Sequence, residues 1–190
     1  MFLISTQRTG ENTPGQAEDA LLRSIAQGDR DALRQLYIAA APRLFGYALS
    51  ILRSRPEAED ILQDTFLKIG EKAGSYTSQG KPIAWMLAIT RNLCYMRLRS
   101  QKGSLSLEED PLANLPAPSQ LEFLESRLVL KGALLALGLM ERQIVLLHAV
   151  CGFKHREIAS FLGLPLSTVL SKYSRSLKKL RAYLKEENHG

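Results

Sequence analysis

The chain has only two cysteines and one tryptophan among 190 residues, and it has no long uninterrupted apolar run. Cys94 and Cys151 lie in apolar, helical contexts, and nothing in the cysteine content indicates secretion. No apolar stretch approaches the roughly 20 residues needed to cross a bilayer. The apolar start, Met1 to Ile4, is too short for a signal peptide. We therefore expect a cytoplasmic protein with reduced thiols and no membrane insertion.

The sequence also lacks the residue groups that enzymes use. It contains no phosphate-binding loop, no nucleophile constellation and no catalytic carboxylate pair. The best candidate for a metal site is His148 with Cys151, with His155 nearby, but a structural zinc ion needs four ligands and the other cysteine is distant. The apolar run around this pair favours packing in a core. We predict no catalytic residue, no metal site and no cofactor, and we expect that the protein is not an enzyme.

Basic residues are concentrated at the C-terminal end. Residues 127–190 hold 11 Lys and Arg against 4 Asp and Glu, a net charge of +7, whereas residues 1–126 hold 14 against 15, a net charge of −1. Within that neutral part, Lys81 to Lys102 is basic and Glu57 to Asp64 is acidic. Two basic segments and an acidic one indicate a nucleic acid and a second, different partner.

Apolar residues recur at helical spacing along most of the chain, and no segment reads as a strand. Helices are expected to begin near Ala17, Asp29, Pro42, Pro56 and Pro82. At Pro42 the expectation is a new helix or a kink. Gly70 to Lys81 is rich in Gly and Ser and predicts a loop.

Composition divides the chain into four parts. We predict a disordered tail at residues 1–18, a helical bundle at 19–102, a linker at 103–120 and a second bundle at 121–187. The expected fold is all-α, with two small helical bundles joined by a flexible linker.

The second bundle contains the pattern of a helix-turn-helix. His155 to Leu162 has helical spacing and ends at Gly163-Leu164-Pro165, where Gly suits a left-handed turn and Pro suits the first position of a helix. An apolar stripe follows from Leu166. Between Thr168 and Lys185 there are six Lys or Arg residues and no Asp or Glu. One packed face and one basic face suit a helix that enters a DNA major groove.

Taken together, these features resemble the extracytoplasmic-function (ECF) group of bacterial RNA polymerase sigma factors, from about residue 19 to residue 185. The string Ala58 to Lys68 (AEDILQDTFLK) is similar to the family's segment that docks on the clamp helices of the largest polymerase subunit. The resemblance implies that core RNA polymerase is the second partner. The residues that it assigns to docking are Glu59, Asp60, Gln63, Asp64 and Phe66.

Trp85 to Asn92 (WMLAITRN) resembles the family's helix that engages and opens the −10 promoter element. An aromatic ring in the preceding loop can stack on an unpaired base, and arginines can hold phosphates. The residues assigned to −10 DNA are Tyr76, Trp85, Arg91, Asn92, Arg97 and Arg99. Trp85 lies on the apolar side of its helix, so packing in the core is an alternative role.

Leu137 to Arg175 resembles the family's −35-binding unit. The resemblance implies that the early residues of the last helix meet base edges and that later lysines meet phosphates. The residues assigned to −35 DNA are Ser167, Thr168, Ser171, Lys172, Arg175, Lys178 and Lys179. Many family members are held inactive by an anti-sigma factor, and only the resemblance implies one here.

Some positions depart from the family pattern. Met96 replaces a usual Asp in the −10 helix, Gly70 replaces an aromatic residue, and Leu170 stands where a basic residue is common. The expected function is a sigma factor that binds core polymerase and directs promoter-specific initiation. The alternative is a stand-alone dimeric helix-turn-helix regulator that does not bind polymerase, which would leave Ala58 to Lys68 and Trp85 to Arg99 unexplained.

Overall fold

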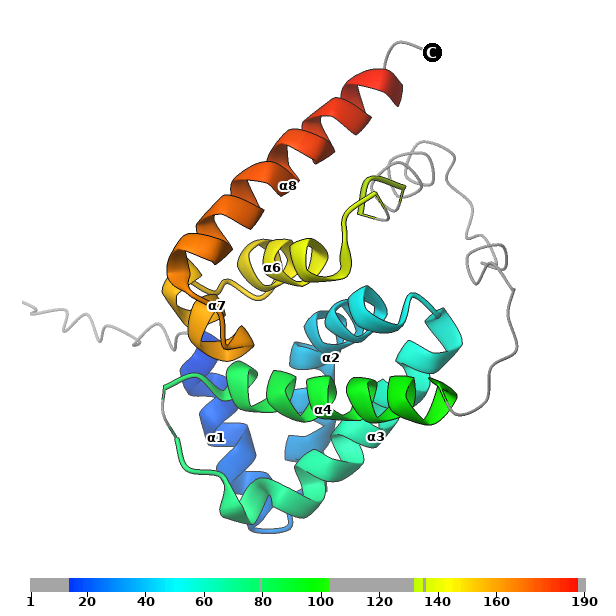
Figure 1. Ribbon diagram of the computed structural model, residues 1–190. Coiled ribbons are helices and arrows are strands. Elements are labelled where there is room, and N and C mark those ends of the chain that lie inside the picture. Colours follow the sequence, from blue (N-terminus) through cyan, green and yellow to red (C-terminus); the bar gives the residue numbers. More distant parts are fainter. Residues whose placement is uncertain (1–13, 79, 103–131, 135, 188–190) are drawn as a thin grey trace, which may run out of the picture.

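The computed structural model describes residues 14–78, 80–102, 132–134 and 136–187, and every regular element within them is a helix. The all-α prediction is therefore confirmed. The first bundle comprises α1 (Pro14–Ala26), α2 (Arg30–Leu52), α3 (Arg55–Lys72), the 3-10 turn η1 (Ala73–Ser75) and α4 (Pro82–Lys102). The second comprises α6 (Leu139–Ala149), α7 (His155–Leu162) and α8 (Leu166–Glu187), and the C-terminal part of α8 projects beyond the other helices (Figure 1). The predicted linker at 103–120 lies outside the described residues.

Side-chain caps stand at the starts of α2 and α3, close to the expected positions Asp29 and Pro56. The Asp29 carboxylate accepts hydrogen bonds from the backbone N–H groups of Asp31 (2.9 Å) and Ala32 (3.1 Å) at the start of α2. The Ser54 hydroxyl accepts from the Glu57 N–H at the start of α3, at 3.4 Å. These side chains satisfy backbone donors that the first turn of a helix leaves unpaired.

Of the two expectations at Pro42, a new helix or a kink, the new helix is wrong, because α2 runs from Arg30 to Leu52 with Pro42 inside it. Proline removes one helical hydrogen bond. The packed face of α2 nevertheless continues across this position: Leu36, Ala40 and Leu44 are all fully buried, while Pro42 itself is exposed. Burial of that face on both sides of the proline maintains one helix.

Two other element boundaries also differ from the prediction. Residues 14–18, expected in the disordered tail, form the first turns of α1, and Glu18 is buried in an ion pair with Arg43 of α2. The loop expected from Gly70 begins only after η1, because α3 continues to Lys72 and buries Ile69 against the core. Both differences arise from burial against other helices, which short sequence windows do not contain.

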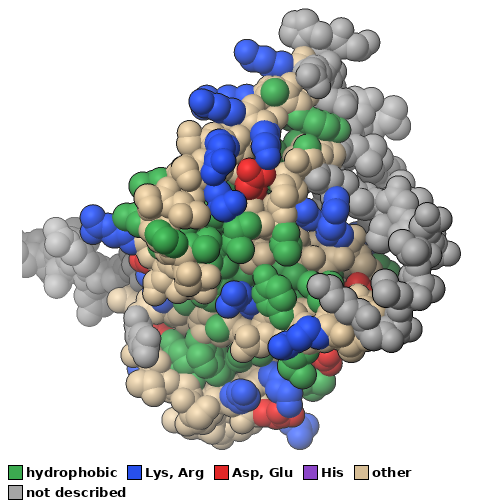
Figure 2. Space-filling model, viewed as in Figure 1, with side chains coloured by type: hydrophobic (Ala, Val, Ile, Leu, Met, Phe, Trp, Pro, Cys, Tyr) green, Lys and Arg blue, Asp and Glu red, His purple; other side chains and the backbone are tan. Residues whose placement is uncertain are grey.

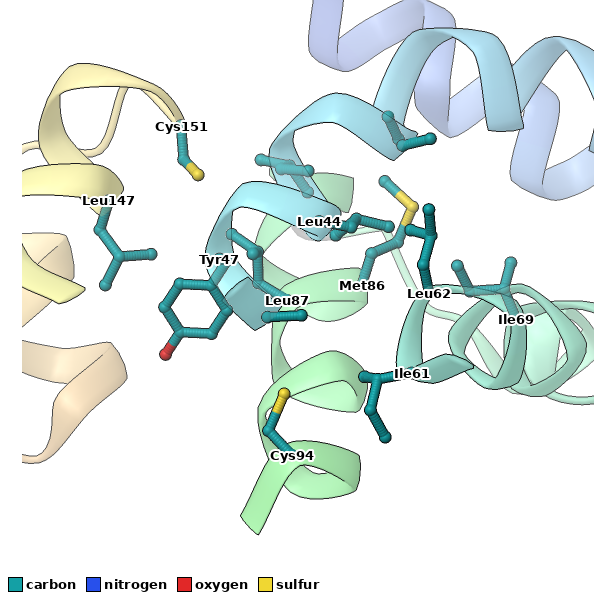
Figure 3. Packing of buried hydrophobic residues seen from close by; sticks show 14 of the residues in the cluster. Leu44, Tyr47, Ile61, Leu62, Ile69, Met86, Leu87, Cys94, Leu147 and Cys151 are labelled. Carbon is teal, nitrogen blue, oxygen red and sulfur yellow. The ribbon is translucent and has the colours of Figure 1, made fainter. Parts of the chain in front are cut away.

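The two bundles pack against each other through α2 and α6. Tyr47 of α2 is buried in one apolar cluster with residues of both bundles, among them Leu147 and Cys151 (Figure 3). Its hydroxyl donates to Oε1 of the buried Gln143 at 3.0 Å. Buried Arg142 donates to the carbonyl oxygens of Ser50 (3.2 Å) and Leu137 (3.0 Å). The second bundle therefore completes its core against the first.

Candidate nucleic-acid and partner-binding surfaces

The residues expected to dock a partner lie along α3. Glu59, Asp60 and Gln63 are exposed, and Asp64 is half-buried. Glu59 accepts from Arg55 Nε at 2.7 Å, and the Asp60 carboxylate lies 3.7 Å from a guanidinium nitrogen of Arg97 on α4. We call Glu59, Asp60, Gln63 and Asp64 the acidic face of α3. It combines carboxylates that are accessible to a basic partner with a helix backbone held rigid by its buried side.

The remaining expected docking residue, Phe66, is 7% exposed and contributes to the core. Its ring centroid lies 4.8 Å from that of Tyr37, which is 45% exposed on α2. Leu67 is 66% exposed. It lies three and seven residues after Asp64 and Asp60, so it shares their side of the helix. The expected docking set did not include Tyr37 or Leu67, which lie beside it. For Leu67 the helical spacing from Asp60 was the available signal, whereas the position of Tyr37 depends on packing between α2 and α3.

Tyr76 and Trp85, the two expected base-stacking residues, contact each other. Their ring centroids are 4.9 Å apart, and both side chains are half-buried. The hydroxyls of Tyr76 and Ser78 donate to the buried carboxylate of Asp19 on α1. Burial, together with the hydrogen bond to Asp19, raises the pKa of Tyr76 to about 12. The loop before α4 is thus fastened to α1, and its aromatic ring is held against Trp85.

The polar residues of α4 divide into two groups. Asn92 and Arg99 are exposed, together with Met96 at 59%. Arg91 is half-buried, and its guanidinium carbon lies 5.4 Å from the ring centroid of Tyr95 and 5.9 Å from that of Phe161 on α7. Arg97 is half-buried and pairs with Asp60 as described above. The arginines nearest the core therefore already have partners within the molecule.

The helix-turn-helix predicted at residues 155–184 is present. Helix α7 ends at Gly163, whose φ of 68° lies in the left-handed region that favours glycine. The Leu164 N–H donates to the Ala159 carbonyl at 2.9 Å, and the Gly163 N–H donates to Ser160 at 3.3 Å. Pro165 lies one position before α8 rather than inside it. Its carbonyl accepts from the Thr168 N–H (3.0 Å), which begins the helix.

Most of the expected −35 residues lie on the outer side of α8. Val169 and Ser176 are buried on its packed face, and Thr168 and Lys172 are half-buried beside it. The exposed members of the set are Ser167, Ser171, Arg175, Lys178 and Lys179. Figure 2 shows Lys and Arg side chains spread along α8 on the viewed side.

Lys179 of α8 forms an ion pair with Glu141 of α6. Its Nζ lies 2.8 and 3.1 Å from the two carboxylate oxygens of Glu141. The hydrogen bond from Lys179 lowers the pKa of Glu141. The same carboxylate accepts from the Gly138 N–H at 3.2 Å, at the start of α6. Lys179 therefore helps to hold the second bundle together.

The rings of His148, His155 and Tyr173 meet at the base of the helix-turn-helix, and the sequence analysis grouped only the two histidines. The His148 and His155 rings stack with centroids 4.4 Å apart, and Tyr173 of α8 lies edge-on to both, at 4.9 and 4.7 Å. His148 Nδ1 is 2.8 Å from the Phe153 carbonyl oxygen. Burial, with His148 adjacent, lowers the pKa of His155. This cluster joins α6, α7 and α8.

The two cysteine thiols are buried in the apolar core. Burial raises the pKa of Cys94 to about 12 and that of Cys151 to about 11. Among the described residues, no group of three or more His, Cys, Asp or Glu side chains is arranged to hold a metal ion. Within the same part of the chain, none of the helices combines the length and apolar character needed to cross a membrane.

Comparison with known proteins accounts for both bundles. Two family models match the chain: sigma-70 region 2 at residues 36–104 and sigma-70 region 4 at residues 127–180. The ECF RNA polymerase sigma factor SigK of Mycobacterium ulcerans (strain Agy99) is 29% identical over 178 residues, which covers 88% of this chain and 95% of that protein.

Two solved structures have a similar fold. The sigma factor RpoE of Bartonella quintana, in complex with the anti-sigma factor NepR, is 28% identical with a TM-score of 0.65, and the match covers 80% of this chain and 96% of that one. CnrH in complex with the cytosolic domain of CnrY is 23% identical with a TM-score of 0.64, covering 90% and 98% of the two chains.

The matched regions together span more than half of the chain, and they coincide with the helices that carry the acidic face and the helix-turn-helix. The chain belongs to the ECF group of sigma-70 family sigma factors. It is an RNA polymerase sigma factor, a subunit that directs core polymerase to promoter DNA. A stand-alone helix-turn-helix regulator is not favoured, because that reading leaves the match to region 2 unexplained.

Proposed function

We propose that the bundle assigned to residues 19–102 docks on the clamp helices of the largest polymerase subunit through the acidic face of α3. Asp60, Gln63 and Asp64 supply polar and charged contacts to a basic surface, and Leu67 and Tyr37 add apolar area beside them. Phe66 contributes indirectly: its buried ring packs against the Tyr37 ring, with the two centroids 4.8 Å apart, and so positions Tyr37. Exposed carboxylates next to exposed apolar side chains suit an interface with a polar rim and an apolar centre.

The bundle assigned to residues 121–187 reads the −35 element through α8. Ser167, Thr168 and Ser171 occupy its first turns, where side chains of a recognition helix reach base edges, and Lys172 and Arg175 follow within hydrogen-bonding reach of guanine. Lys178 lies further along and meets phosphate. Lys179 reaches a phosphate only by leaving the Glu141 carboxylate. The exchange replaces one anionic partner with another.

The −10 element is captured by α4 and the loop before it. Asn92 and Arg99 are exposed and offer direct contacts. Arg91 and Arg97 exchange their contacts with Phe161 and Asp60 for the phosphates of the separated strand. Tyr76 and Trp85 present two aromatic rings that are tilted to one another with centroids 4.9 Å apart, and an unpaired base can stack on such a ring.

The protein contributes no bond-making chemistry of its own in this proposal, because RNA synthesis belongs to the polymerase, and it acts in the cytoplasm, where that enzyme works. RpoE of Bartonella quintana is held by an anti-sigma factor in its solved structure. We propose by analogy that an anti-sigma factor covers the polymerase- and DNA-binding surfaces of this chain.

The observation that carries the docking proposal is the acidic face itself, with Asp60 and Leu67 exposed on one side of a helix whose other side is buried. The test is co-elution of the purified chain with bacterial core RNA polymerase on a sizing column. A stoichiometric complex is expected for the wild-type chain. The double variant Asp60→Lys with Asp64→Lys should lose it, because the basic surface of the polymerase then meets lysines.

The control is Asp31→Lys, which reverses an exposed carboxylate in the first turn of α2 rather than on α3. This variant should co-elute like the wild type. Circular dichroism should show unchanged helix content in all three proteins. Retention of the complex by the double variant would remove the acidic face from the docking surface.

A further inference from the structure

Leu170 is an exposed apolar side chain at the start of the recognition helix. It is 46% exposed, although the residue before it, Val169, is fully buried. The side chains one position after it, three before it and four after it are Ser171, Ser167 and Ser174, and all three are exposed. Ser167 and Ser174 are its neighbours on the helix surface, together with the half-buried Leu166 and Tyr173. Leu170 is therefore more exposed than the apolar side chains beside it, and exposed serines lie next to it.

Exposure alone decides nothing, because single exposed leucines are ordinary on protein surfaces. The position of Leu170 is what distinguishes it. From Leu166 to Ser171 the helix carries no charged side chain, and its first cation is Lys172. The turns that enter the groove deepest are thus uncharged, while the cations follow. Short uncharged side chains allow the helix to approach base edges closely, and an aliphatic group there cannot bind phosphate.

We propose that Leu170 recognises a thymine of the −35 element by packing against its C5-methyl group. This inference rests on the proposed −35 function of α8. Thymine is the only base that presents a methyl group in the major groove, and apolar side chains distinguish it there. The serines on either side of Leu170 provide hydrogen bonds to adjacent bases or phosphates. Leu170 is in this role a specificity-determining residue, distinct from the cations that supply most of the affinity.

The test removes the methyl group and nothing else. The holoenzyme, assembled from the full chain and core polymerase, first selects its preferred −35 sequence from promoter duplexes randomised in that element. Each thymidine of the selected element is then replaced in turn by deoxyuridine, which lacks only the C5-methyl group. Holoenzyme affinity is measured for each duplex by competition at fixed salt.

With the wild-type chain, one deoxyuridine substitution should weaken binding about fourfold, the equivalent of about 0.8 kcal/mol for one buried carbon group. Leu170→Ala should bind the parent duplex about fourfold more weakly and should not distinguish it from that deoxyuridine duplex. The matched control is Leu184→Ala, which truncates a leucine 37% exposed on the same helix, about 21 Å further along. It should keep the wild-type sensitivity.

Three results would overturn the inference. The wild-type holoenzyme could be indifferent to every deoxyuridine, Leu170→Ala could retain the sensitivity, or Leu170→Ala could weaken assembly with core polymerase, which would assign the side chain to a protein contact. These failures differ from failure of the proposed function itself. In the latter case no holoenzyme forms, or the randomised element yields no preferred sequence.

Discussion

The basic helices of the two bundles, α4 and α8, present their cations differently. On α4, Arg91 lies half-buried between the rings of Tyr95 and Phe161, and Arg97 pairs with a carboxylate of α3. On α8, Arg175 and Lys178 are exposed. The difference arises from packing. Helix α4 contacts α1, α2 and α3 and also faces α7, whereas α8 packs by one face on α6 and α7.

A helix that packs against the protein by one face leaves its other faces exposed, where a ligand can bind. In the proposed function, the −35 surface of α8 is therefore largely formed in the isolated protein, while the −10 surface of α4 exchanges internal contacts for DNA. The exchange costs little, because a partly exposed pair such as Arg97 with Asp60 contributes about 0–1 kcal/mol.

The largest effect is expected where the second bundle depends on the first. Leu147 is fully buried in the cluster that also contains Tyr47 (Figure 3). Leu147→Ala should lower the free energy of unfolding by about 2–5 kcal/mol, because it loses buried area and leaves a cavity. Urea denaturation followed by circular dichroism measures this. The exposed Leu170→Ala should stay within about 0.5 kcal/mol of wild type. A similarly small effect at Leu147 would mean that the two bundles are held independently.

A smaller effect is expected for Arg175 on DNA. Arg175→Ala should cost about 1–3 kcal/mol of discrimination at one −35 base pair if the guanidinium contacts a guanine bidentately. Arg97→Ala should cost less −10 affinity than Arg175→Ala costs at −35, because wild-type Arg97 must first leave Asp60. Holoenzyme affinities for single-base promoter variants give both numbers. A uniform loss on all sequences would reassign Arg175 to phosphate, and an equal loss for Arg97 would contradict the difference between the helices.

The smallest predicted effect is a pH dependence of stability that is confined to the second bundle. Of the three histidines of the chain, His148 and His155 lie in the second bundle and none lies in the first. The pKa of His155 is lowered in the folded protein, so the unfolded chain binds its proton more readily. That contribution to stability is complete above the ordinary histidine pKa near 6.5 and is lost as the pH falls below it. Amide hydrogen exchange should accelerate in α7 and α8 between pH 7.5 and 5.5 after correction for intrinsic rates.

His155→Gln is the control for this pH effect, because glutamine keeps a polar side chain without titrating in this range. The variant should show a smaller change between the two pH values. Its α2 and α3 amides should behave like those of the wild type. An equal acid response in wild type and variant would assign the effect to other groups, such as the carboxylates of Glu141 and Glu157, whose pKa values are lowered by Lys179 and Lys81.

Much of the fold could be predicted from the sequence because its signals are local. Asp29 caps α2, and Gly163 ends α7 with a left-handed residue, as short-range patterns indicated. Helix α4 begins at Pro82 as expected. Where burial opposed a local signal, the prediction failed, as at Pro42 and at the start of α1. The assignments of individual residues to polymerase and DNA stay predictions until the experiments above are done.

The sequence by itself determined the helices, the sign of charge on each, and the family, because periodicity, caps and motif strings are properties of neighbouring residues. Only the tertiary structure decided which of the assigned side chains face solvent. Phe66 supports Tyr37 from the core, Lys179 pairs with Glu141, and Arg97 pairs with Asp60. The physical reason is that each of these contacts joins residues on different helices, and their approach depends on how the buried faces pack together.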